Sequence, residues 1–177
     1  MINIFETELE KGTGIPYILI KNEIVKASPE VDSILLDNIL NCTAYDPQCE
    51  GLRSEYMYSI VENYQNRAAV YKGVLDFFEK MTDTDWGDQQ TFAFVCILAE
   101  KNIADKKIIY EKIRWYIENE KDDLYTMYDF AEKEGFEASQ FVAHELGKLL
   151  EKNPEYSLAC YDGFFRNFHN KDAVLSF

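Results

Sequence analysis

The residues best suited to chemistry in this 177-residue chain are its two histidines and four cysteines. They are His144 and His169, with Cys42, Cys49, Cys96 and Cys160. A structural zinc site needs such side chains at short, regular separations, as in Cys-x-x-Cys or in two histidines one helical turn apart. Neither spacing occurs here. The sequence therefore predicts no metal site and no cofactor, and buried free cysteines are the simpler interpretation.

Cys49 is the best placed of these residues for nucleophilic catalysis, because it lies near an expected helix N-terminus, which lowers a thiol pKa. A nucleophile also needs a base that a third group holds in place, and no histidine is close to Cys49 in sequence. Position 49 falls on the apolar side of the expected helix. We therefore expect Cys49 to pack in the core and the protein not to be an enzyme. Thiol chemistry at Cys49, or acid chemistry around Arg53, is the less favoured alternative.

Residues 44–58, AYDPQCEGLRSEYMY, form the least generic stretch of the chain. Asp46 followed by Pro47 is a helix-start signal, because Asp caps the first turn and proline gives up no hydrogen bond there. Arg53 stands among acidic residues, where it either anchors a ligand or braces a loop. Trp86, in an acidic linker, is either a pin between repeats or an exposed binding aromatic. The candidate partner-binding residues are Tyr45, Asp46, Gln48, Glu50, Arg53 and Trp86.

The same stretch carries a resemblance to a known family. Its signature, YDPQCEG-x-R-x-EY, is matched at Tyr45, Asp46, Pro47, Gln48, Cys49, Glu50, Gly51, Arg53, Glu55 and Tyr56. With the segments that follow, it resembles bacterial HEAT-repeat-containing proteins over residues 41–119. That family has no established activity to carry over. The resemblance implies a helical solenoid with a binding role.

The chain is strongly acidic, with 32 Asp and Glu against 18 Lys and Arg and a formal net charge of −14. Such a field repels nucleic acid and anionic membranes and favours a protein partner with a basic surface, or simply high solubility through solvated helix faces. The hydrophobic content of 47% and the length predict one domain over residues 1–177. We see no secretory segment, and the longest apolar run, 92–99, is too short to cross a bilayer. We therefore expect a cytoplasmic protein with reduced thiols.

Apolar residues recur every three or four positions along most of the chain, which predicts helices. Ser28 before Pro29 is a clean start signal, and Gly135 is a stop signal. Residues 15–25 fit a strand or a helix, and helix is favoured because a single strand would have no partner. The other predicted helices span residues 2–10, 29–42, 47–65, 66–81, 89–101, 104–119, 122–134, 137–152 and 156–169.

Residues 92–99 are apolar on nearly every side, so their helix is expected to be the buried centre of the fold. The side chains expected to dominate the core are Phe77, Phe78, Phe92, Phe94 and Phe141. The last predicted helix carries an aromatic stripe at Phe164, Phe165 and Phe168. We expect the tail, further chain or a second subunit of a homo-oligomer to cover this stripe.

Paired helices recur with a period of about 32–37 residues, which is typical of HEAT or TPR arrays. We therefore expect an all-α fold, an α-α superhelix built as a HEAT-like solenoid of antiparallel helix pairs. The expected function is non-enzymatic protein–protein interaction through an acidic, tyrosine-rich surface. The alternative is an acidic mimic of nucleic acid that occupies the basic groove of a nucleic-acid-binding protein.

Overall fold

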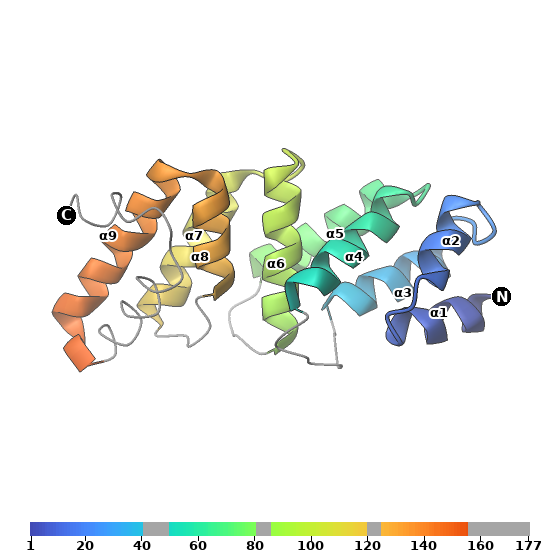
Figure 1. The fold of residues 1–177 in the computed structure, drawn as a ribbon, viewed down its shortest axis with the longest axis horizontal. Coiled ribbons are helices and arrows are strands. Elements are labelled where there is room, and N and C mark those ends of the chain that lie inside the picture. The colour runs from blue at the N-terminus through green and yellow to red at the C-terminus, as the bar shows by residue number, and fades with distance from the viewer. Residues whose placement is uncertain (41–49, 81–85, 120–124, 156–177) are drawn as a thin grey trace. The chain divides into compact units, whose positions relative to one another are not determined.

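A computed structural model describes residues 1–40, 50–80, 86–119 and 125–155, and every regular element in these segments is an α-helix (Figure 1). The helices are α1 (Ile2–Glu10), α2 (Ile15–Lys21), α3 (Pro29–Leu40), α4 (Glu50–Glu62), α5 (Arg67–Lys80), α6 (Trp86–Glu100), α7 (Lys106–Glu118), α8 (Tyr125–Glu134) and α9 (Phe136–Lys152). The prediction of an all-α fold is confirmed. The helical alternative for residues 15–25 is confirmed over α2.

Side-chain caps and left-handed residues set several helix ends where the sequence places them. Ser28 Oγ accepts a hydrogen bond from Val31 N at 3.2 Å, as expected of the N-cap before α3. Asp105 caps α7 in the same way through Lys107 N, at 2.9 Å. Gly135, with φ of 98°, separates α8 from α9, because this backbone conformation favours glycine. The helix start expected at Asp46-Pro47, and the helix at 156–169, lie outside the described residues.

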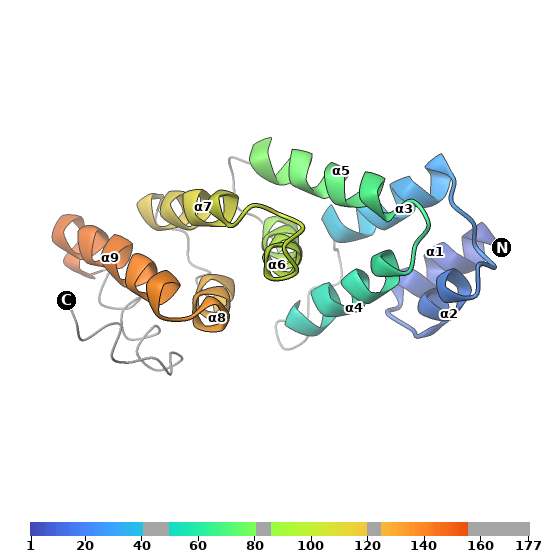
Figure 2. The same cartoon turned by 90° about the horizontal axis from the view of Figure 1, so that it is seen from above.

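The chain divides into two compact units, Met1–Ala104 and Asp105–Phe177, which we describe separately. In the first unit, contacts join every second helix: α1 to α3 to α5, and α2 to α4 to α6 (Figure 2). In the second unit, α9 contacts both α7 and α8. The expectation of a single domain over residues 1–177 stays a prediction.

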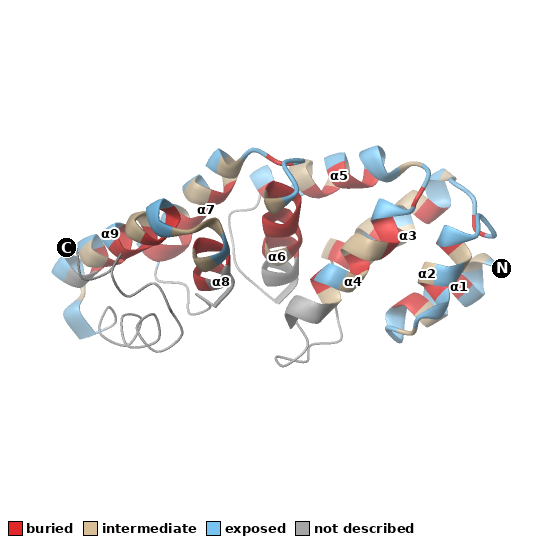
Figure 3. Ribbon diagram, turned by 45° about the horizontal axis from the view of Figure 1, so that its top comes forward, coloured by how far each residue is buried: buried red, intermediate tan, exposed pale blue. Residues whose placement is uncertain are grey.

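Helix α6 is the buried centre of the first unit. Its described side chains from Thr91 to Ala99 are all buried except the partly buried Ala93 (Figure 3). It contacts α3, α4 and α5, so neighbours cover most of its circumference. The interpretation of residues 92–99 as a helix with apolar side chains on every side, and therefore packed on most sides, is confirmed.

Three of the five phenylalanines expected in the core are there. Phe78, Phe92 and Phe94 are at most 2% exposed, and the Phe78 and Phe92 rings stack at 5.8 Å. Phe141 is only partly buried. The prediction is wrong for Phe77, which is 39% exposed, because the buried stripe of α5 runs through Val70, Val74 and Phe78 and a helix turns about 100° per residue.

Helix α2 shows which of its apolar residues face inward. Pro16 and Ile20 are buried, whereas Ile15 and Ile18 are exposed. The periodicity of residues 15–25 therefore identified a helix without identifying its buried face. Apolar residues stand at nearly every position of IPYILI, and such a run fits several faces equally well.

Gly73 allows α3 and α5 to approach closely. A Cβ added at Gly73 would lie 3.0 and 3.1 Å from the two methyl carbons of Leu36. Such distances are shorter than ordinary van der Waals contact, so the glycine keeps room for the leucine.

The neighbouring residues Phe77 and Phe78 provide a direct test of this core. Phe78→Ala should lower the free energy of unfolding by about 3–5 kcal/mol, because it opens a cavity against Phe92. Phe77→Ala should cost less than about 1.5 kcal/mol, since the ring is already in contact with water. Urea denaturation of both variants measures the difference. Equal losses would show that the face of α5 is wrongly assigned.

Candidate functional site

The structure describes only some of the six residues predicted to bind a partner. Tyr45, Asp46 and Gln48 lie outside the described residues, as does Cys49. Glu50 and Trp86 are the first residues of α4 and α6, and their side chains are also outside the described set. Arg53 is the one candidate with a described side chain. The binding role of this stretch stays a prediction, and the structure shows only what the Arg53 side chain contacts.

Arg53 makes a structural contact. Its side chain is partly buried, and Nη2 donates a hydrogen bond to Asn38 Oδ1 on α3 at 3.2 Å. The contact joins α4 to α3, which is consistent with the bracing interpretation, and the ligand-anchor interpretation stays a prediction. The described partner is an amide on another helix, and the side chains of the nearby acids Asp46 and Glu50 lie outside the described set.

Tyr56, the last residue of the signature, also makes a long-range structural contact. Its hydroxyl donates to the backbone carbonyl of Thr13, in the turn between α1 and α2. Burial raises the pKa of Tyr56, which keeps the hydroxyl protonated as a donor. The two signature side chains Arg53 and Tyr56 therefore tie α4 to α3 and to the turn between α1 and α2.

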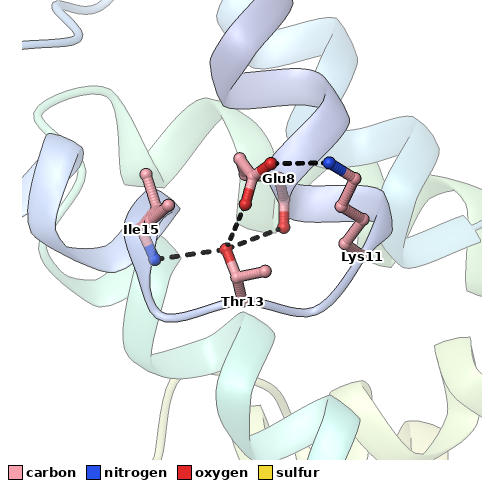
Figure 4. A network of polar contacts seen from close by, with 4 residues as sticks. All are labelled: Glu8, Lys11, Thr13 and Ile15. Carbon is pink, nitrogen blue, oxygen red and sulfur yellow. Dashed lines mark hydrogen bonds and ion pairs between the residues drawn. The ribbon is translucent and has the colours of Figure 1, made fainter.

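The turn that Tyr56 contacts is itself ordered by a small polar network (Figure 4). Thr13 Oγ1 donates to Glu8 Oε2 at 3.0 Å and accepts from Ile15 N at 3.4 Å. Lys11 Nζ pairs with Glu8 Oε1 at 2.8 Å. The hydrogen bonds from Lys11 and Thr13 hold the pKa of Glu8 below its ordinary value. The network fixes the direction in which the chain enters α2.

A second network joins the start of α3 to the turn between α4 and α5. Tyr64 OH donates to Asp32 Oδ1 at 2.7 Å, and Asn66 Nδ2 donates to Asp32 Oδ2 at 2.7 Å. Ser28 N in turn donates to Tyr64 OH at 3.1 Å. Burial, followed by the hydrogen bond to Asp32, raises the pKa of Tyr64 to about 12. These hydrogen bonds hold the N-terminal end of α3 against the turn between α4 and α5.

The tyrosines whose side chains the structure describes are buried or partly buried. Of the eight with described side chains, four are buried and four are partly buried. The buried ones are Tyr64, Tyr71, Tyr116 and Tyr128. Tyr58 is partly buried, with its ring 6.3 Å from Tyr71 and 6.4 Å from Phe94. An exposed apolar surface must therefore come from other residues.

Exposed apolar side chains concentrate at α1, α2 and the turn after α2. Eight large hydrophobic side chains are exposed among the described residues, and five of these lie in residues 1–24. We call these five the isoleucine surface: Met1, Ile4, Ile15, Ile18 and Ile24. Ile4 is 58% and Ile18 53% exposed, on helices that contact each other. The sequence showed these apolar residues but did not show which of them are exposed.

Carboxylates accompany the isoleucine surface. Glu6 and Glu10 on α1, and Glu23 after α2, are exposed. None of the three makes an ion pair or a side-chain hydrogen bond with a described residue. An apolar surface with carboxylates that lack internal partners is suited to a ligand that is apolar and cationic.

Metal-ligand clusters are absent from the described part of the chain. No three His, Cys, Asp or Glu side chains are grouped there so as to hold a metal ion. Cys96 is buried in α6, where the neighbouring residues of the helix are also buried. Of the described helices, none is both long and apolar enough to span a membrane.

Comparison with known proteins gives no match: no protein-family model, curated protein or solved structure matches this chain. The assignment of function therefore rests on the surfaces just described.

Tyr56→Phe should lower the free energy of unfolding by about 0.5–1.5 kcal/mol, the usual contribution of one hydrogen bond. Tyr17→Phe is the matched control, because its hydroxyl accepts from Lys21 Nζ at 3.2 Å, one turn along the same exposed helix surface. It should cost less than about 0.5 kcal/mol. Chemical denaturation compares the two. An unchanged free energy of unfolding in Tyr56→Phe would show that the hydrogen bond from Tyr56 to Thr13 does not stabilise the fold.

Alkaline pH should weaken the Tyr64 network. Tyrosine titrates near pH 10 in an unfolded chain, and the folded protein raises the pKa of Tyr64 to about 12. The folded state holds this proton more tightly, so the stabilisation is complete below pH 10 and is lost as the pH rises through 12. Tyr64→Phe should cost about 1.5–3 kcal/mol at pH 8. The difference in the free energy of unfolding between wild type and Tyr64→Phe should become smaller above pH 10.

Urea denaturation of wild type and Tyr64→Phe at pH 8, 9, 10 and 11 measures that difference. Asp32→Asn is the control, because it removes the charge beside Tyr64 while keeping an oxygen acceptor. In that background the narrowing should still begin near pH 10 but should be smaller, because the folded-state pKa of Tyr64 lies closer to its unfolded-state value without the Asp32 charge. A difference in the free energy of unfolding that stays constant up to pH 11 would contradict the raised pKa of Tyr64.

Proposed function

We propose that this chain is a non-enzymatic module that binds another protein through the isoleucine surface. The observation that carries the proposal is the concentration of five of the eight exposed large hydrophobic side chains in residues 1–24. Single exposed aliphatic residues are ordinary on a protein surface, whereas grouped ones mark interaction sites. Full burial of one isoleucine is worth about 1.5–3 kcal/mol, so a few such contacts suffice for a stable complex.

The charge of the chain defines the partner. The carboxylates of Glu6, Glu10 and Glu23 flank the isoleucine surface without an ion pair to a described residue. The whole chain carries a net charge of −14, which steers cationic partners toward it. The partner is therefore a segment with aliphatic side chains on one face and lysine or arginine beside them.

A HEAT-like solenoid is the proposed scaffold for this surface. Its support is the alternate-helix contact pattern of the first unit, in which α3 contacts α1 and α5, and α4 contacts α2 and α6. Stacked helix pairs generate such contacts, because each pair buries its apolar stripes against the next. The resemblance to HEAT-repeat-containing proteins, and the binding role it implies, belong to the same proposal.

The nucleic-acid mimic is the weaker alternative. A mimic needs carboxylates in rows on an exposed face, in place of phosphates. The exposed ion pairs of the described helices instead put lysine among the acids, at Lys72–Asp76 and Lys107–Glu111. This mixture is typical of a solvated helix surface.

The double substitution Ile15→Ser with Ile18→Ser should weaken binding of a basic amphipathic probe at least tenfold. The probe is a fluorescent 14-residue helical peptide of leucine and lysine, titrated at low salt with anisotropy as the readout. The loss follows because each isoleucine would contribute about 1 kcal/mol or more of buried apolar contact. Stability should change little, since both side chains are exposed.

Ile103→Ser is the matched control, because Ile103 is 42% exposed and Ile15 43% exposed. It should leave the affinity within twofold of wild type. A second control peptide replaces every lysine with glutamate and should not bind. The proposal fails if both serine variants bind the basic peptide equally well, or if the acidic peptide binds as tightly as the basic one.

A further inference from the structure

Helix α7 has a charge opposite to that of the chain as a whole. Its sequence, KKIIYEKIRWYIE, holds four cationic side chains and two acidic ones. Lys112 is buried, with Nζ 4.9 Å from the centre of the Trp115 ring. The exposed cation nearest the middle of the helix is Arg114, which contacts α9.

Arg114 is held in place by two contacts. Its Nε lies 3.5 Å from Oε2 of Glu145, a carboxylate that is 3% exposed. Its guanidinium carbon lies 5.4 Å from the centre of the Phe141 ring. The ring and the carboxylate both attract the guanidinium group and restrict where it lies.

Aromatic rings extend this contact along α7 and α9, which lie side by side (Figure 2). Tyr110 meets Phe141 edge-on at 4.8 Å and meets the buried Phe130 at 6.1 Å. Tyr110 and Phe141 are both partly exposed, so their outer edges are accessible beside Arg114. We call Tyr110, Arg114, Phe141, Glu145 and Lys148 the Arg114 cluster.

The charges of the Arg114 cluster do not balance. Lys148 Nζ lies 2.8 Å from Glu145 Oε1, so two cations share one carboxylate. The Arg114 side chain is 47% exposed and Lys148 51% exposed. Among the described residues, no hydrogen bond reaches Nη1 or Nη2 of Arg114. The cluster thus presents a fixed guanidinium edge, with an excess positive charge, next to two aromatic rings.

We propose that the Arg114 cluster binds a carboxylate side chain of an acidic partner segment, with an aliphatic neighbour of that carboxylate on Tyr110 and Phe141. A guanidinium edge matches the two oxygens of a carboxylate, which is the geometry that lysine lacks. Aromatic and arginine side chains together are also the composition of strongly contributing interface residues. This surface lies in the second unit. Its proposed ligand is acidic, whereas the ligand proposed for the isoleucine surface is basic.

The test uses a fluorescein-labelled dodecapeptide of alternating glutamate and leucine, titrated with the whole chain at low salt. Arg114→Gln should weaken binding at least tenfold. Arg114→Lys keeps the charge and the ion pair to Glu145 but loses the planar edge, and should weaken binding at least threefold. Phe141→Leu keeps an apolar side chain of similar size and should also weaken binding, because the stacking surface is lost.

Lys152→Gln is the matched control, since Lys152 is an exposed cation on α9 outside the cluster. It should leave binding within twofold, and a peptide with glutamine in place of glutamate should not bind. The proposal is overturned if Lys152→Gln weakens binding as much as Arg114→Gln, if Arg114→Lys binds like wild type, or if the glutamine peptide binds equally. Circular dichroism checks that each variant is folded, and a folded Arg114→Lys keeps the test decisive if Arg114→Gln unfolds.

Discussion

The burial of α6 is the constraint on which the first unit depends. A helix with apolar side chains in every direction is stable in water only when other helices cover most of it. Helices α3, α4 and α5 provide that cover, and the Phe78–Phe92 stack joins α5 to α6 at its centre. The polar ties from α4, through Arg53 and Tyr56, then fix where the outer helices lie. Packing thus determines the arrangement, and hydrogen bonds refine it.

Local signals made the helices predictable. Ser28 before Pro29, the all-round apolar run at 92–99 and Gly135 each act over a few neighbouring residues, so the sequence shows their effect directly. The buried positions of α7 at Ile109, Ile113, Tyr116 and Ile117 follow the three- and four-residue spacing of a helix face, so the sequence shows them as well.

Faces and long-range contacts were less predictable. In α2 and around Phe77, apolar residues are adjacent in sequence, and periodicity does not choose between adjacent residues. The tie from Tyr56 to Thr13 joins positions 43 apart and requires the packed fold. Arg53 was noticed because of nearby acids, yet its described partner is Asn38 on another helix. The Arg114 cluster was missed because a basic stretch of one helix is hidden in the composition of an acidic chain.

The close approach at Gly73 limits how the sequence can vary. The methyl carbons of Leu36 lie 3.0 and 3.1 Å from the position of a Cβ added at Gly73. The close spacing of α3 and α5 at this point therefore favours glycine, which has a hydrogen atom in place of a side chain. Among homologous chains that keep this spacing, we expect positions 36 and 73 to change together. A larger residue at position 73 should therefore occur together with a smaller residue at position 36.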